Sequence, residues 1–481
     1  MIFDAILYRD LSLRNAPSSN ALRAFVRFIE KKLRVSVMVG SRQIPYERPD
    51  LIEPIQIAQA LYKSRVIESF YPVNILPDEP PLRDWGCRYF GGIEGESSAG
   101  GTSTIDDKSA LFAALAEGLE RYLWHAQTDY FPYPKTCTVE EIAKYGAYIS
   151  PENFCAFSAE QRGRSERGRL TKGTSYLWIK SRSMVSNKNV YVPAQIVSAS
   201  VKTHGKDHAE PLIRQQTTTG LATWPTLSGA RLSGALEVIE RDAFMIMWFN
   251  QLTLPRIELV SVRGKSSSLD KLIDSCQKYR LKIHIVPMLT DAPTHAICVV
   301  IEDMSGHAPR FTMGLRANQS LLFCIEKATT EALRARVSYR NNILTNKSWN
   351  INTPVEKIGH KDRIYYWGVP ENAKHLEFLT QGKEIPYEPA LWENDTLQEH
   401  LGRILAWCKE NNYECLSVSL GKSKANPTPW FVEMVVLPDL QPIHLHEWLR
   451  HLGGKRLTSI PKLFGYTPRE NPFIDRPHPF V

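Results

Sequence analysis

Two segments of the sequence carry a pair of glutamates followed directly by an arginine, and these residues are the strongest candidates for chemistry. The first segment is ALAEGLERY, with Glu117 and Glu120, and the second is ALEVIERDA, with Glu237 and Glu240. Residues three apart lie on one face of a helix, so each segment presents two carboxylates in the same direction. Small and apolar neighbours surround the glutamates in both segments. We therefore expect these carboxylates to be partly buried.

Four carboxylates that converge in a partly buried site need a positive partner. Two like charges about 4 Å apart repel by roughly 4 kcal/mol at an effective dielectric constant of 20. The segments have no histidine or cysteine pattern. Carboxylate oxygens without such ligands suit Mg²⁺, which usually bridges to the phosphates of a nucleotide. The predicted metal ligands are Glu117, Glu120, Glu237 and Glu240.

A single Glu-x-x-Glu-Arg motif is most often a solvated helix face on which a glutamate contacts the arginine. Two features favour a ligand site instead: the motif occurs twice, and a segment rich in Gly, Ser and Thr precedes each copy. We predict that both preceding segments are loops whose backbone N–H groups and hydroxyls bind phosphate where the helix begins. The candidate residues are Ser98, Gly100, Gly101, Thr102, Thr219 and Gly220.

A third segment, EALRAR, carries Glu331, Arg334 and Arg336. Taken by itself, this segment is a basic amphipathic helix. Beside an anionic ligand, its guanidinium groups would form a fork that binds phosphate oxygens. Both interpretations stay open from the residues alone.

The elements that must position these residues alternate between helix and strand. Apolar periodicity predicts helices over residues 19–32, 106–125, 230–249, 268–278 and 320–341. Apolar and alternating runs predict strands over residues 282–288, 295–303, 414–420 and 431–438. The first glutamates of the two motifs lie 120 residues apart (237 minus 117), and this spacing predicts two pseudo-repeated halves of one fold. The predicted fold class is mixed α and β.

Composition excludes several classes of protein. The chain has 481 residues, of which 43% are hydrophobic, and this is enough for a large core. A net charge of +8 without a Lys/Arg block argues against nucleic-acid binding. No apolar run approaches the roughly 18 residues that a membrane span needs, and the first residues lack a basic leader. The eight cysteines include no Cys-x-x-Cys pair, so we expect a cytoplasmic protein without a disulfide framework.

Together the three segments resemble the ordered motifs of the YcaO superfamily over roughly residues 91–340. The resemblance rests on SAGGTSTIDDKSALFAALAEGLER, GLATWPTLSGARLSGALEVIERDA and EALRAR. It implies an α+β, YcaO-type ATP-binding fold with mixed and antiparallel sheets flanked by helices. It also implies that the four glutamates hold Mg²⁺ around ATP, that Glu331 belongs to the nucleotide site, and that Arg241 and Arg336 face the phosphates. Gly229 and Thr219 depart from the family pattern, so one metal or ribose contact is expected to be missing or supplied differently.

The C-terminal tail narrows the resemblance. Its sequence, RENPFIDRPHPFV, is similar to the Pro-rich tail of YcaO proteins that install azoline rings in ribosomally made peptides, with Val481 in place of a final proline. A stiff polyproline segment can enter a site at low entropic cost, whereas chain termini generally fray. The resemblance implies catalytic roles for Pro477, His478, Pro479 and Val481, with His478 or the terminal carboxylate as the conjectured general base.

The implied activity is that of an ATP-dependent cyclodehydratase. In this chemistry a Cys, Ser or Thr side chain of a precursor peptide attacks the preceding backbone carbonyl, and ATP phosphorylates the oxygen that leaves, giving a thiazoline or an oxazoline. Two other hypotheses stay open. One is a YcaO enzyme that activates the backbone for a different nucleophile, as in thioamide formation, and the other is a non-catalytic accessory scaffold.

Related azoline-forming enzymes work with a ubiquitin-activating-like or winged-helix protein that binds the leader of the precursor peptide. The segment before residue 86 is too short for both modules, so we expect a separate partner and assign residues 1–85 to its docking segment and a linker. Residues 86–436 are predicted to form the catalytic ATP-binding domain, and residues 437–481 a C-terminal extension. We further expect a homodimer or hetero-oligomer within a bacteriocin-type or antibiotic synthetase. A flavin dehydrogenase is a possible further partner.

Overall fold

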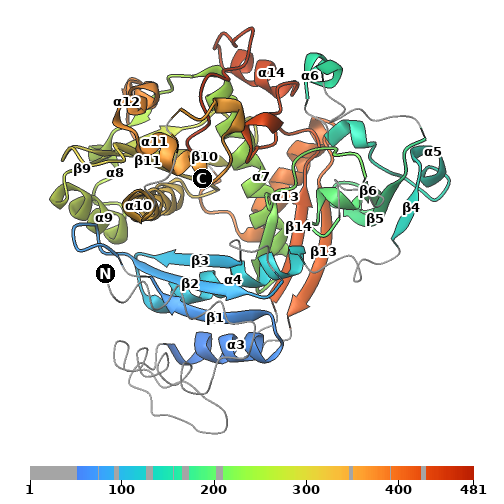
Figure 1. Ribbon diagram of the computed structural model, residues 1–481, viewed down its shortest axis with the longest axis horizontal. Coiled ribbons are helices and arrows are strands. Elements are labelled where there is room, and N and C mark those ends of the chain that lie inside the picture. Colours follow the sequence, from blue (N-terminus) through green and yellow to red (C-terminus); the bar gives the residue numbers. More distant parts are fainter. Residues whose placement is uncertain are drawn as a thin grey trace.

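A computed structural model describes residues 51–480 of the chain, with internal gaps. The gaps are residues 74, 92–96, 126–133, 155–156, 165–172, 202–209, 346–349, 351, 391 and 424–429. The helix predicted over residues 19–32 and the terminal Val481 lie outside the described residues. Three β-sheets and the helices packed on them make up the fold (Figure 1), so the predicted mixed α and β class is confirmed.

The first sheet has the strand order β1-β2-β3, the second β11-β10-β9-β8-β12, and the third β4-β5-β13-β14-β7 with β6 paired to β5. Strands β8 and β12 run parallel, whereas the other pairs are antiparallel. The strand bounds are β1 Ile67–Pro72, β2 Arg83–Tyr89, β3 Ser98–Ser103, β4 Lys135–Cys137, β5 Tyr176–Ser183, β6 Asn189–Pro193, β7 Leu221–Trp224, β8 Arg256–Ile257, β9 Leu281–Pro287, β10 His295–Asp303, β11 Phe311–Asn318, β12 Glu384–Ile385, β13 Leu416–Ser423 and β14 Trp430–Val436.

A long helix follows one outer strand of each sheet. Helix α4 (Asp107–His125) packs on β3 and β2, α7 (Leu227–Asn250) on β14 and β7, and α10 (Leu321–Thr345) on β11 and β10. The bounds of all three helices agree closely with the sequence prediction. The spacing of the motifs predicted two repeated halves, and the structure adds a third strand–helix unit, because β11–α10 repeats the arrangement of β3–α4 and β7–α7.

The remaining helices are shorter; α3, α5, α8 and α9 pack on strands, whereas α11, α13 and α14 pack on the long helices α10 and α7. Their bounds are α3 Ile52–Lys63, α5 Val139–Ile142, α6 Ala159–Arg164, α8 Leu259–Val262, α9 Ser267–Lys278, α11 Asp362–Gly368, α12 Pro370–Ala373, α13 Leu397–Glu410 and α14 Arg456–Leu463. Short 3-10 helices span Pro151–Phe154, Ala194–Ile196, Val355–Lys357, Lys374–Thr380 and Glu447–Leu449. The helix predicted over residues 268–278 and the four predicted strands correspond to α9, β9, β10, β13 and β14.

Helix α7 is the central helix of the molecule (Figure 1). Every side chain from Asp242 to Asn250 is buried, and a helix that is apolar on all sides belongs in a core. Its cap fixes where it begins, because the Thr226 hydroxyl accepts a hydrogen bond from the backbone N–H of Gly229. The glutamates of the second motif therefore sit near the middle of a rigid, enclosed helix.

The first Gly/Ser-rich segment is a strand, which corrects the loop predicted from its composition. Strand β3 pairs with β2 from Ser98–Arg88 to Ser103–Arg83. The glycines serve close packing here, because a Cβ atom on Gly101 would lie 2.2 Å from the carbonyl oxygen of Ala110 in α4. Composition alone does not distinguish a loop glycine from a strand glycine that lets a helix approach.

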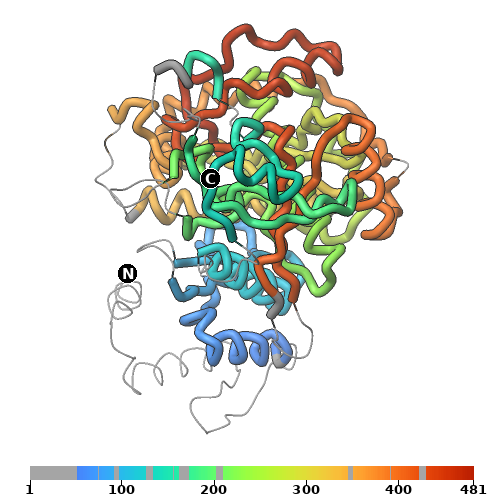
Figure 2. Tube along the Cα trace, turned by 90° about the vertical axis from the view of Figure 1, so that its right-hand side faces the viewer, coloured from blue at the N-terminus to red at the C-terminus, as the bar shows by residue number. Residues whose placement is uncertain are grey.

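The predicted boundary at residue 85 falls inside the first sheet. Strand β1 pairs with β2 from Ile67–Tyr89 to Pro72–Trp85, and α3 packs on β1 and α4. Figure 2 shows this first sheet and α3 as a layer below the rest of the molecule. The second predicted boundary, at residue 436, coincides with the end of β14, after which the chain returns across α7 and ends in the centre of the molecule (Figure 1).

The close approach of strand and helix in the third unit predicts a clear stability effect. A Cβ atom on Gly314 would lie 2.1 Å from the carbonyl oxygen of Ala328 and 2.6 Å from the backbone nitrogen of Ala332. We expect Gly314→Ala to lower the free energy of unfolding by about 1–3 kcal/mol, measured by urea denaturation, because backbone atoms must move apart. Gly402 in α13 is exposed and has nothing within 4 Å of an added Cβ. Gly402→Ala should therefore raise the same quantity by roughly 0.5–1 kcal/mol.

Candidate functional site

The outer strands β3, β7 and β11 belong to three different sheets, and a carboxylate from the helix that follows each strand binds its free edge. The backbone N–H of Gly100 donates to Glu117 at 2.9 Å, that of Gly220 to Glu237 at 3.1 Å, and that of Leu315 to Glu331 at 2.6 Å. The three units thus repeat one contact. In each unit one glutamate of the helix, Glu117, Glu237 or Glu331, satisfies a backbone N–H group of its own unit.

The side chain three residues further along each helix reaches the next unit. Glu120 of α4 accepts a hydrogen bond from the backbone N–H of Thr223 at 2.5 Å, and Glu240 of α7 accepts one from Ala317 at 2.9 Å. In α10 the equivalent residue is Arg334, which donates to the carbonyl of Gly100 at 3.3 Å. These contacts link the first unit to the second, the second to the third, and the third back to the first. The four predicted acids and Glu331 are therefore brought together.

Two arginines balance part of this negative charge. Arg121 lies 3.1 Å from Glu117 and also donates to the Thr218 hydroxyl at 2.8 Å. Arg241 lies 3.5 Å from Glu237 and 3.6 Å from Glu240. Both arginines immediately follow the second glutamate of their motif.

Burial favours the protonated form of three of the acids, Glu120, Glu240 and Glu331. Burial raises the pKa of Glu120 to about 8, assisted by the negative charges of Glu117 and Glu237. Burial likewise raises the pKa of Glu240 to about 7, opposed by Arg241 and assisted by Glu331. The pKa of Glu331 is also raised by burial. Burial is the largest cause in each case; negative neighbours add to it at Glu120 and Glu240, whereas nearby arginines oppose it at Glu331.

The donor set fits a divalent cation beside a phosphate group. Five carboxylates face two arginines that contact them among the described residues, and Arg316 and Arg334 attract Glu331 at longer range. A divalent cation would add to the positive charge that these arginines supply. A ligating carboxylate must lose its proton, and the raised pKa values show that this loss is incomplete without a cation. The Nη1 atom of Arg241 is buried and has no hydrogen-bond partner among the described residues. Such a donor suits an anionic oxygen.

Most of the other predicted phosphate-binding residues contact the acids or other parts of the fold, whereas Thr219 lines a cavity. The N–H groups of Gly100 and Gly220 are taken up by the glutamates, and Thr102 donates its hydroxyl to Asp84 at 3.0 Å. Ser98 is the exposed first residue of β3, and Gly101 packs against α4. Thr219 lines a narrow cavity together with Arg241. Thr219 is thus the member of the predicted set that shares a cavity with Arg241.

The structure does not bring Arg336 to the acids. Its guanidinium lies 3.0 Å from Glu79 and 2.6 Å from Asp303, and it donates to the carbonyl of Pro309 at 3.2 Å. Arg336 is buried in this ion pair because it lies on a different face of α10 from Glu331. Arg334 lies on the same face as Glu331, 3.3 Å from Asp84. A Cβ atom on Gly100 would lie 1.8 Å from Nη2 of Arg334, so the strand glycine makes room for this guanidinium.

The C-terminal tail is buried against the site, as its resemblance implied. Pro477, His478, Pro479 and Phe480 are all buried. The guanidinium of Arg241 lies over the ring of Phe480, 4.1 Å from its centroid. The tail therefore reaches the arginine that contacts both glutamates of α7.

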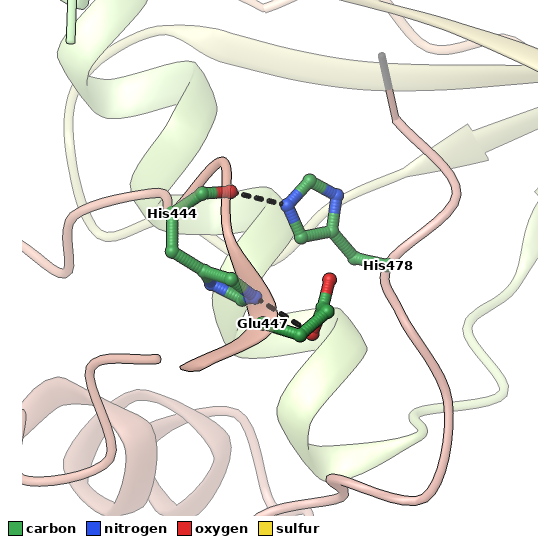
Figure 3. A group of neighbouring side chains, drawn as sticks. All are labelled: His444, Glu447 and His478. Carbon is green, nitrogen blue, oxygen red and sulfur yellow. Dashed lines mark hydrogen bonds and ion pairs between the residues drawn. The ribbon is translucent and has the colours of Figure 1, made fainter. Parts of the chain in front are cut away.

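His478 belongs to a buried cluster with His444 and Glu447 (Figure 3). Its Nε2 donates to the His444 carbonyl at 2.7 Å, and His444 Nε2 donates to Glu447 at 3.1 Å. Arg363 and Arg450 contact the same carboxylate at 2.7 Å and 2.8 Å. Three cationic or donor groups already satisfy Glu447, so the cluster is a hydrogen-bonded anchor for the tail. Burial lowers the pKa of His478 well below its ordinary range, and its Nδ1 atom makes no hydrogen bond among the described residues. A general-base role for His478 stays a prediction.

Sequence reasoning missed Arg121 and the backbone donors Thr223 and Ala317. Arg121 could have been found, because it occupies the position in the first motif that Arg241 occupies in the second. Arg334 was named as part of the guanidinium fork of the third segment, but the sequence did not show that it, rather than Arg336, lies on the face of Glu331. The backbone donors leave no signal in the residue types, since any residue has an N–H group to donate.

The chain belongs to the YcaO cyclodehydratase family, which is described as ATP- and Mg²⁺-binding and whose model matches residues 102–441. Three solved structures share its fold. A heterocyclase in complex with substrate and cofactor gives a TM-score of 0.69 at 18% identity, over 94% of this chain and 60% of that chain. YcaO from Methanopyrus kandleri bound with AMPPCP and Mg²⁺ gives 0.58 at 16% identity, over 82% and 91%. The E. coli microcin synthetase McbBCD complex with pro-MccB17 bound gives 0.60 at 13% identity, over 86% and 96%.

A curated relative, an uncharacterized protein of Methanothermobacter thermautotrophicus, is 23% identical over 208 residues, which is 42% of this chain and 53% of that protein. The matched region therefore spans about half of that relative. Among the described helices, none is long and apolar enough to cross a bilayer.

The raised pKa values predict a pH-dependent thermal stability. Glu120 and Glu240 retain protons in the folded chain up to pH 7–8 but lose them on unfolding at their ordinary pKa of about 4.5. The free energy of unfolding without metal should therefore fall as the pH rises from about 5 to 8. Millimolar Mg²⁺ should raise the apparent Tm by several degrees at pH 8 and have little effect at pH 5. Differential scanning calorimetry would measure both effects, and a Tm independent of pH and Mg²⁺ would contradict this account. Glu120→Gln should reduce the dependence of the free energy of unfolding on pH.

The two arginines of α10 should differ in their effects. Arg334→Gln is expected to weaken Mg-ATP binding by about tenfold to a hundredfold, because it removes a guanidinium at the site. It should destabilise the fold less than Arg336→Gln does, because Arg334 is more exposed and pairs with a single buried acid, Asp84. Arg336→Gln should instead lower the free energy of unfolding by about 3–5 kcal/mol, because Glu79 and Asp303 keep buried charges without their partner. Calorimetric titration and urea denaturation of both variants would test the assignment. If Arg336→Gln weakened Mg-ATP binding and Arg334→Gln did not, Arg336 would belong to the site instead.

Proposed function

We propose that this chain is an ATP-dependent cyclodehydratase that converts Cys, Ser or Thr residues of a ribosomally made precursor peptide to thiazolines or oxazolines. The observation that carries the proposal is the buried Pro-rich tail, whose Phe480 ring lies against Arg241 beside the paired acids. In the YcaO proteins whose tail this one resembles, a Pro-rich C-terminus is found in enzymes that form azoline rings in peptides. An accessory scaffold would not need a converging set of five acids and a tail that reaches it.

In this proposal Glu117, Glu120, Glu237 and Glu240 hold Mg²⁺, with Glu331 closing the site. Bound Mg-ATP would supply the phosphoryl group that makes the peptide carbonyl oxygen a leaving group. The chain's own residues would position the reacting groups and neutralise the negative charge that develops on them. Arg241 is held by two glutamates and an aromatic ring, so its guanidinium is already oriented when negative charge develops near it. Thr219 borders the same cavity, where it stands in place of the asparagine of the family pattern.

The peptide chemistry itself needs a site that excludes water. The side chain of the modified residue adds to the preceding carbonyl carbon, the carbonyl oxygen departs, and a ring with a C=N bond remains. Each ring therefore costs the peptide one water. A preorganised, buried set of charges favours this outcome over hydrolysis of the activated amide.

We propose further that a separate ubiquitin-activating-like or leader-binding protein delivers the precursor, within a cytoplasmic multi-protein synthetase. The McbBCD complex with pro-MccB17 bound, which shares this fold, is a multi-chain assembly that holds a peptide. A homodimer or hetero-oligomer is expected, and a flavin dehydrogenase would act on the rings afterwards. The docking surface for the partner is assigned to residues 1–85.

An intact-mass time course tests the activity. The protein is captured from its source cells with its native precursor and partners, and the mixture is incubated with Mg-ATP. We expect ATP-dependent loss of one water for each modified residue, and no loss with Glu240→Gln. The control requires that Glu240→Gln still assembles with its partners. Exchange of oxygen for sulfur would indicate thioamide formation instead, and no change in mass would favour an accessory role.

A deletion tests the docking assignment. Removal of residues 1–50 leaves β1, β2 and the acids in place, so the fold should persist. We expect the partner protein to be lost from affinity pull-downs, while the thermal shift with Mg-ATP is retained. Retention of the partner after the deletion would place the docking surface outside residues 1–50.

A further inference from the structure

We infer that Phe480 is a positioning residue for Arg241, and that the C-terminal anchor cluster acts on the nucleotide site through this ring. The inference rests on the proposed nucleotide site and adds a residue that no motif of the sequence singles out. In this inference the tail orients the guanidinium group of Arg241.

Arg241 is the arginine that joins the two acids of α7. Its Nη2 lies 3.5 Å from Glu237 and its Nη1 lies 3.6 Å from Glu240. A free arginine side chain has many rotamers, and holding it in one orientation costs about 2 kcal/mol of conformational entropy. A third contact is needed to fix the plane of the guanidinium.

The ring of Phe480 supplies that third contact. It lies 4.1 Å from the guanidinium carbon of Arg241, which is well within the range of a cation–π interaction. A third carboxylate would also fix the arginine, but it would use N–H donors and cancel its charge. An aromatic face does neither, so the N–H donors of Nη1, which lies 3.6 Å from Glu240 and makes no hydrogen bond among the described residues, stay available to an anionic oxygen.

The equivalent arginine of the first unit is fixed in a different way. Arg121 contacts Glu117 and uses Nη1 to donate to the Thr218 hydroxyl at 2.8 Å. In the second unit the Phe480 ring takes the place of that hydroxyl. The two arginines therefore occupy repeated positions but keep different numbers of donors available.

The ring is itself held on several sides. Phe244 of α7 packs against it, with ring centroids 5.8 Å apart. The Tyr339 hydroxyl donates to the Pro479 carbonyl at 3.1 Å, and Arg363 donates to the Phe480 carbonyl at 3.4 Å. These contacts come from α7, α10 and α11.

The anchor cluster completes the chain of contacts. His478 donates to the His444 carbonyl (Figure 3), and Arg363 joins Glu447 to the Phe480 carbonyl. Because the backbone on both sides of the ring is bonded, Phe480 cannot move away from Arg241 without breaking buried hydrogen bonds. A change in the cluster therefore reaches Arg241 through the ring.

The test is a double-mutant cycle on Mg-ATP affinity with the full-length chain in its native complex. Phe480→Leu keeps the apolar contact with Phe244 but removes the π face, and it should weaken binding by about tenfold. Phe480→Tyr keeps the π face and should restore binding. Arg241→Gln should weaken binding at least as much, and the double variant should bind no worse than Arg241→Gln alone. A merely structural role for Phe480 would make the two losses multiply.

Phe473→Leu is the matched control. Phe473 lies in the same C-terminal segment and packs on Trp248 at 5.5 Å between ring centroids, but the structure gives it no contact with Arg241. We expect it to lower the apparent Tm as Phe480→Leu does and to leave Mg-ATP affinity unchanged. Wild-type affinity in Phe480→Leu, or multiplied losses in the double variant, would overturn the inference.

The failure of this inference and that of the proposed function are distinguishable. If the cycle shows coupling while the precursor loses no water, Phe480 positions Arg241 in a nucleotide site whose reaction is not cyclodehydration. If the precursor loses water but the cycle shows no coupling, the proposed function holds and the positioning role is wrong. If the wild-type complex binds no Mg-ATP, both are wrong.

Discussion

The hydrogen bonds between helix carboxylates and the free edges of β3, β7 and β11 are the interaction on which the rest of the site depends. An outer strand carries backbone N–H groups that are costly to bury without a partner. Here Glu117, Glu237 and Glu331 supply the partner within each unit, and Glu120 and Glu240 supply it between units. Because the sheets hold one oxygen of each carboxylate, the positions of the acids are set by backbone geometry rather than by flexible side chains.

This arrangement explains why the acids can be both buried and charged when they act. A backbone N–H group stabilises the ionised form of a carboxylate, while burial destabilises it. The balance leaves the pKa of Glu240 at about 7 and that of Glu120 at about 8, close to neutral pH. A cation can then displace the remaining protons without a large energetic cost. Arg334 breaks the repeat, because the side chain that reaches the next unit is a glutamate in the first two units and an arginine in the third.

Much of the fold could be predicted from the sequence, because apolar periodicity marks α4, α7, α9, α10 and the longer strands directly. The acids of the site were also predictable, since a duplicated motif is visible in the residues. The role of the Gly-rich segment was not, because glycine permits a loop and close strand–helix packing alike. Arg336 was chosen by its place in the motif, whereas the face of α10 that meets the acids is set by tertiary packing, which favours Arg334.

The tail could be predicted to enter the site but not to contact Arg241. Phe480 follows Arg241 by 239 residues (480 minus 241), and no local pattern connects the two. The contact exists because Tyr339, Arg363 and the His444 carbonyl hold the last residues in place. These groups lie in segments that follow α7 in the sequence. Phe480 can therefore contact Arg241 only when the last residues are packed against those segments. The ring of units and the tail therefore depend on each other, since the units provide the groups that bind the tail and the tail orients the arginine between their acids.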